Sequence, residues 1–292
     1  MNCSFSMPNS PRSSVAPHRP HPRAALLALL LTTAGLAVQA HDIVLVPQAD
    51  GWRVRYGHPQ DWLPVDGEKL LALQIFNGSA PPLDPHDALR RQGLDLLLTG
   101  PRQPPGDGLV AASYDNGLWA RLPANPALPG TKPSYRNTSR WLAPGADDTL
   151  VSLKFAKGWR GVGASARAAS VASADNPAWR REVGHLLELV PQLDPLTLKP
   201  GALLPVKVLL NGLPLAGAGV ELSDLVTKLP EDRITRYTTD ANGIAQVPLR
   251  PHGVQMLGVD LERPNDGSLA EGARSLPVDK LLIVATYTFV RP

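Results

Sequence analysis

The sequence predicts an all-β protein made of two β-sandwich-like subdomains. Proline (31 residues) and glycine (25 residues) together approach a fifth of the 292-residue chain. They separate many short apolar runs, a pattern typical of strands joined by tight turns. No segment carries the apolar period of a helix longer than two turns.

The first half begins with a predicted hairpin. The apolar runs at 43–46 and 52–56 flank Asp50-Gly51, and Asp-Gly between apolar runs favours a tight β turn. The further strands predicted in this half span residues 70–76, 94–99, 109–113, 118–122 and 149–155.

The second half is more regular. Its predicted strands span residues 186–190, 204–210, 218–222, 236–239, 244–249, 254–261 and 281–289. About seven short strands with frequent turns favour an immunoglobulin-like or transthyretin-like sandwich. Residues 161–175 are almost entirely Gly, Ala, Ser and Val, which is typical of a linker. We therefore expect an N-terminal β domain over 41–160, a linker over 161–180 and the C-terminal sandwich over 181–292.

The first 40 residues predict a secretory signal peptide. Arg12, Arg19 and Arg23 precede the apolar run at 24–38, and Val38-Gln39-Ala40 places small residues at a cleavage site. The run is shorter than the roughly 20 residues of a spanning helix. We expect cleavage after Ala40 and a periplasmic protein that begins at His41 and is not inserted in the membrane.

Charge and cysteine content exclude several function classes. Removing the three leader arginines leaves 26 basic and 26 acidic residues, so no basic surface for nucleic acid is expected. The single cysteine, Cys3, lies in the leader, so the mature chain has neither a disulfide nor a thiol nucleophile. The common catalytic signatures, such as Gly-x-Ser-x-Gly and His-Glu-x-x-His, are missing from the sequence. We therefore predict a binding protein and not an enzyme.

The histidines indicate what could be bound. As the first mature residue, His41 would offer its α-amine and its ring Nδ1 to the same ion, and an α-amine with a pKa near 8 loses its proton readily to a metal. If His41 starts the first strand and His58 ends the second, the antiparallel hairpin brings both to one end. Such nitrogen donors suit nickel, cobalt, copper or zinc as divalent ions.

Two further residues are candidate ligands. Asp42 is adjacent to His41 and could coordinate the ion or orient a ligand, and His185, before a strand of the second half, could close the site from across the domain boundary. His86 and His252 lie in predicted loops and turns, where a surface role is expected.

A carbohydrate- or protein-binding module of the cell envelope is the alternative function. It would use exposed aromatic faces for stacking or sheet edges for pairing. That reading requires at least two exposed tryptophans on one face. The six candidates are Trp52, Trp62, Trp119, Trp141, Trp159 and Trp179.

Several motifs together resemble a family of bacterial secreted proteins. They are Ala40-His41-Asp42, Arg55-Tyr56-Gly57-His58, Tyr114 to Trp119, Leu153 to Lys157, Gly184 to Pro191, Leu198 to Gly201, Gly212 to Ala218 and Thr239 to Gly243. The chain is similar to the uncharacterised-domain family linked with the periplasmic component of cobalt/nickel transport systems, the NikM group.

The resemblance implies a β-rich secreted protein that works with a membrane metal transporter. It also implies that His41, His58 and His185 match histidines common in the family. Members often carry a histidine on the penultimate strand, where this chain has Val259-Asp260-Leu261. A ligand there is therefore absent or replaced by Asp260.

Overall fold

The computed structural model describes residues 41–77, 80–99, 107–125, 127, 130–138, 143–161, 177–229, 233–267, 269 and 277–292. Its regular elements are strands and three short 3₁₀ helices, η1 (Gly67–Lys69), η2 (His86–Ala88) and η4 (Ala178–Arg180). The predicted all-β class is confirmed. The predicted signal peptide lies outside the described residues. None of the helices in the described ranges is long and apolar enough to cross a membrane.

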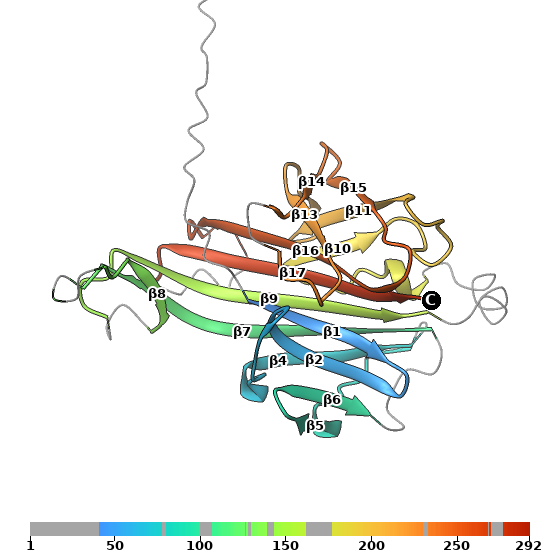
Figure 1. Cartoon of the computed structure of the whole chain (residues 1–292), viewed down its shortest axis with the longest axis horizontal. Coiled ribbons are helices and arrows are strands. Elements are labelled where there is room, and N and C mark those ends of the chain that lie inside the picture. The colour runs from blue at the N-terminus through green and yellow to red at the C-terminus, as the bar shows by residue number, and fades with distance from the viewer. Residues whose placement is uncertain are drawn as a thin grey trace, which may run out of the picture. The chain divides into compact units, whose positions relative to one another are not determined.

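The largest sheet runs through the centre of the fold (Figure 1). Its described strands follow the order β14-β13-β16-β17-β9-β7-β4, with β8 paired to β7. Their bounds are β4 (Leu70–Phe76), β7 (Gly108–Leu122), β8 (Ser134–Asn137), β9 (Asp148–Arg160), β13 (Gly219–Ser223), β14 (Arg236–Thr238), β16 (Gly253–Pro264) and β17 (Lys280–Arg291).

Two smaller sheets flank this central sheet. The first has the described order β1-β2-β6-β5 with β3 on β2, and contains β1 (Asp42–Gln48), β2 (Gly51–His58), β3 (Asp61–Leu63), β5 (Leu89–Gln92) and β6 (Asp95–Thr99). The second joins β10 (Leu187–Pro191), β11 (Leu203–Leu210), β12 (Leu213–Pro214) and β15 (Ile244–Pro248). In Figure 1 the two lie on opposite sides of the long central strands.

Side-chain alternation along β7 shows how the central sheet serves both cores. Leu109 and Ala111 belong to the core shared with the β10–β15 sheet. Val110 and Ala112 belong to the core shared with the β1–β6 sheet. Successive strand residues point to opposite faces, so the central sheet forms one layer of two sandwiches at once.

The predicted division into two separate domains is therefore corrected. Strand β17, from the end of the chain, pairs in parallel with β9, with Lys280 opposite Leu150 and Phe289 opposite Trp159. The predicted first domain thus shares its sheet with the predicted second. Residues 41 to 292 lie within one compact unit, because each sandwich uses a face of the same sheet.

Most of the predicted linker, residues 162–176, lies outside the described residues. Its end is part of the core and not a spacer. Trp179 in η4 is buried, and its carbonyl oxygen accepts a hydrogen bond of 2.8 Å from the Tyr287 hydroxyl.

Candidate functional site

The β1–β2 hairpin brings two candidate ligands together. Asp42 pairs with Gly57 and Gln48 with Gly51, so the start of β1 lies beside the end of β2. The rings of His41 and His58 have centroids 5.3 Å apart. The expectation that both histidines meet at one end of this hairpin is confirmed.

A second tight turn fixes the position of His58. The chain reverses after His58 into β3, so that His58 lies opposite Asp61. Gly57 has φ +121°, and a Cβ there would lie 2.6 Å from the Asp61 carbonyl oxygen. Only glycine accepts both that conformation and that approach.

Both imidazoles are held in the neutral form that binds metals. Burial lowers the pKa of His58 to about 4, helped by the neighbouring His41. Burial also lowers the pKa of His41, and the charge of Lys154 adds to this effect. His58 Nδ1 lies 3.6 Å from Asp42 Oδ2. Its Nε2 is buried without a hydrogen-bond partner among the described residues, and in the tautomer protonated at Nδ1 this nitrogen offers a lone pair.

The central sheet contributes Lys154 of β9 to the surroundings of the His41–His58 pair. The Lys154 side chain is fully buried, and its Nζ has no hydrogen-bond partner within the described ranges. Burial lowers the pKa of Lys154, while the charges of Asp42 and Asp260 act in the opposite direction. Burial, reinforced by Glu221, raises the pKa of Asp42. Both groups are therefore shifted toward their uncharged forms.

Asp260 lies on the same face of the central sheet as Lys154. Asp260 of β16 is in register with Val284 of β17, which is in register with Lys154. It is thus two strands, or about 10 Å, from the lysine backbone. The Asp260 side chain is exposed and acts on Asp42 and Lys154 through its charge.

The structure does not bring His185 to this site. Its ring contacts Phe155, with centroids 5.0 Å apart. Phe155 packs into the core beneath the β10–β15 sheet, so it points away from its neighbour Lys154, whose charge acts on both His41 and His58. The central sheet separates His185 from the other two histidines, and the expectation that it closes their site is wrong.

The remaining histidines have local partners. His86 Nδ1 lies 2.5 Å from Asp84 Oδ1, and its Nε2 lies 3.0 Å from the Leu70 carbonyl oxygen. His252 Nδ1 lies 2.6 Å from the Pro292 carbonyl oxygen. Neither residue adds a donor to the His41–His58 pair.

The tryptophans that the structure describes do not form the stacking surface expected for the alternative function. Trp52, Trp159 and Trp179 are buried, whereas Trp62 and Trp119 are half-buried. Trp141 lies outside the described residues. The part of the chain that the structure describes therefore offers no pair of exposed tryptophans for stacking.

The described side chains around His41 and His58 do not by themselves form a complete set of metal ligands. Among the described residues, no group of three or more His, Cys, Asp or Glu side chains is placed to hold a metal ion. Two imidazoles with an adjacent carboxyl group can do so only if a further donor joins them. An α-amine on His41 would be such a donor.

Sequence reasoning missed three charged residues around the pair. Lys154 stands in an alternating strand segment, where a lysine usually faces water; its burial depends on a sheet covering each face of β9. Asp61 and Lys228 form an ion pair beside His58. They are 167 residues apart, so no local pattern could connect them.

The comparisons with known proteins identify the family. Residues 105–263 match the family described as Domain of unknown function (DUF4198). The match spans more than half of the 292-residue chain, and the chain belongs to this family. Lys154, His185 and Asp260 lie within the matched residues, whereas His41, Asp42 and His58 precede them.

No curated protein matches the sequence. Among solved structures, the D0-D1 domain of Intimin is similar at 14% sequence identity, with 85% of this chain and 97% of that chain covered and a TM-score of 0.20. At such a TM-score the likeness carries nothing about function to this chain.

Proposed function

We propose that the protein binds a divalent transition metal ion of the nickel or cobalt class through His41 and His58. In this proposal the chain is exported to the periplasm, cleaved after Ala40, and supplies a membrane metal-uptake system. One observation supports it most directly: two neutral imidazoles lie 5.3 Å apart, and one has a buried, unpartnered Nε2.

The donors would be the ring and α-amine of His41 and the Nε2 of His58. Asp42 Oδ2 lies 3.6 Å from the other ring nitrogen of His58, and a slightly closer approach would let it fix the ring orientation as carboxylates do in many metal sites. Nitrogen donors of this kind suit nickel, cobalt, copper and zinc. Burial lowers the pKa of Lys154 to about 8, so the bound cation would favour loss of the Lys154 proton and of the charge that opposes it.

The membership in a family of unknown function is consistent with this proposal but does not choose the ion. The motifs by which the sequence resembles the NikM-like proteins are the reason for proposing nickel or cobalt. Copper and zinc are the competing ions at such a donor set, so each must be measured.

The decisive experiment compares two purified forms by calorimetric titration with nickel, cobalt, copper and zinc. One form starts at His41, and the other carries Gly-Ser before it, which blocks the terminal chelate. We expect tight one-to-one binding to the first form and a large loss of affinity in the second. Since the α-amine has a pKa near 8, binding should weaken as the pH falls below 8.

Two histidine variants test which side chains take part. We expect His58→Ala to lose at least about 100-fold in affinity, more than the loss of an outer partner of a ligand usually costs. His185→Ala should bind as the unaltered protein does, because the central sheet separates it from the site. Equal and weak binding in all four forms would contradict the proposal.

A further inference from the structure

A short segment that starts at the last residue of β13 packs on the strand that begins with Asp42. This segment, Ser223 to Lys228, is called the strap below. Leu225 of the strap is only 7% exposed. Its side chain joins a small cluster with Val44 and Val46 of β1 and Met256 of β16. The strap thus covers the face of β1 opposite to Ile43 and Leu45, which lie in the core between the β1–β6 sheet and the central sheet.

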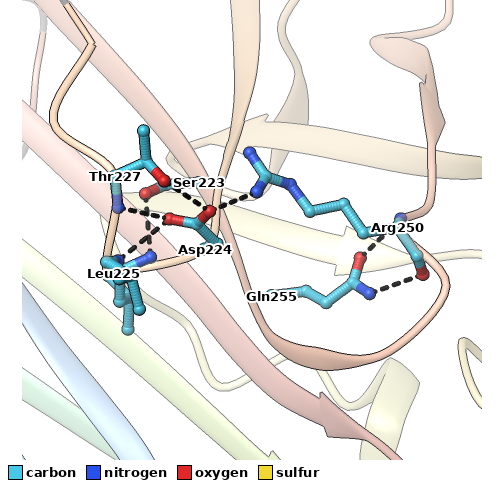
Figure 2. A network of polar contacts seen from close by, with 7 residues as sticks. Ser223, Asp224, Leu225, Thr227, Arg250 and Gln255 are labelled. Atoms are coloured by element: carbon cyan, nitrogen blue, oxygen red, sulfur yellow. Dashed lines mark hydrogen bonds and ion pairs between the residues drawn. The ribbon is translucent and has the colours of Figure 1, made fainter.

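A dense polar network holds the strap at its start (Figure 2). The Asp224 carboxylate accepts hydrogen bonds from the backbone amides of Val226 and Thr227, and from the Thr227 hydroxyl. It also accepts a bond of 2.5 Å from Arg250 Nη1. These contacts keep Leu225 at φ +59°, a conformation that is unfavourable for a bulky side chain.

Arg250 is itself fixed from the other side. Gln255 of β16 accepts from the Arg250 backbone amide and donates to the Arg250 carbonyl oxygen, at 3.1 and 2.8 Å. The start of the strap is therefore tied to the central sheet through Arg250, while its end extends toward β3.

The end of the strap contacts the β2–β3 hairpin, which contains His58. Lys228 Nζ forms an ion pair with Asp61 of β3. Asp61 lies opposite His58 in the β2–β3 pairing. One segment therefore contacts β1, which begins beside His41, and β3, which holds His58.

We propose that the strap sets the spacing of His41 and His58, and that parting Lys228 from Asp61 opens the pair to release its ion. This inference rests on the proposed function. The ion pair suits a release step because it is exposed on both sides, with side chains 38% and 55% accessible. Exposed pairs are individually weak and screened by salt, whereas four hydrogen bonds to the Asp224 carboxylate hold the other end of the strap in place.

The experiment uses the form that starts at His41 and three lysine variants. Lys228→Met removes the ion pair, Lys228→Arg keeps it, and Lys199→Met makes the same charge change at an exposed lysine before β11. Hydrogen exchange without metal reports the mobility of residues 57–63. Stopped-flow mixing of the Ni(II)-loaded protein with a chelator reports the dissociation rate, at low and at high salt.

We expect Lys228→Met to raise both the exchange in residues 57–63 and the nickel dissociation rate by about two- to fivefold, the range for one exposed ion pair. Its dissociation rate should also lose the acceleration by salt that the unaltered protein, Lys228→Arg and Lys199→Met retain. Thermal unfolding of all forms verifies that the fold is intact.

Hydrogen exchange and nickel dissociation together distinguish a failure of the proposed function from a failure of the strap proposal. If the unaltered protein binds no nickel, the proposed function fails, and hydrogen exchange still decides whether the strap holds the hairpin. If nickel binds but Lys228→Met releases it at the unaltered rate, the release role is overturned. Unchanged exchange in Lys228→Met overturns the strap itself.

Discussion

The position of each histidine relative to the central sheet decides which of them can bind one ion together. His41 and His58 share one end of a hairpin, and His185 lies on the other side of the central sheet against Phe155. The sequence could predict the first pairing, because a short hairpin determines its own register. It could not predict the separation of His185, since that depends on which residues of β9 point to each face.

His185 gives a prediction for stability against pH. Burial lowers its pKa to about 4 in the folded state, against 6.5 as the reference value. The folded state therefore binds this proton more weakly than the unfolded chain, and protonation favours unfolding. The contribution of His185 to stability is present above pH 6.5 and is lost as the pH falls toward 4, by up to about 3 kcal/mol.

Urea unfolding across that pH range checks this prediction against a His185→Gln variant. The free energy of unfolding should fall less steeply between pH 6.5 and pH 4 in the variant. Parallel pH profiles for the two proteins would show that His185 is not the titrating group. Nickel affinity at neutral pH should be the same in both.

At the scale of single elements, the β2–β3 hairpin combines a positive φ with a close backbone approach, and both restrict its sequence. Its turn places Gln60 at φ +72° and Gly57 at φ +121°, and the Asp61 backbone closes over Gly57. Sequence analysis predicted β1 and β2 but not β3, because a three-residue strand with one half-buried side chain carries no apolar pattern. Its existence depends on Gly57, which permits the reversal.

Two glycine substitutions test this view of the hairpin. Gly57→Ala should destabilise the fold by about 3 kcal/mol, since it adds a backbone clash to an unfavourable φ. Gly93→Ala has a positive φ but nothing within 4 Å of the new Cβ, so it should cost only about 1 kcal/mol. Chemical denaturation measures both. Equal losses would mean that the close approach of Asp61 to Gly57 has no energetic weight.

For the whole molecule, the all-β class could be predicted from the sequence, but the sharing of one sheet by the two predicted domains could not. Turn residues and short apolar runs predicted most strands. The pairing of β9 with β17 joins residues about 130 positions apart, and no local pattern encodes such a partner. Because β9 is covered on both faces, by Val151 and Trp159 in one core and Ala156 in the other, the two predicted domains became two sandwiches on one sheet.

This shared sheet predicts that the protein unfolds as a unit. A fragment of residues 41–160 would lose β17 from the edge of β9 and leave Val151 and Trp159 without their cover. A fragment of residues 181–292 would leave β17 as an unpaired edge, with Thr286 deprived of the Ile43 carbonyl oxygen that it contacts at 2.7 Å. Neither fragment should unfold cooperatively alone, whereas the chain from His41 should show one urea transition by both tryptophan fluorescence and circular dichroism. Two separated transitions, or a fragment with a cooperative transition of its own, would mean that the halves are independent domains and that the β9–β17 pairing contributes little to their stability.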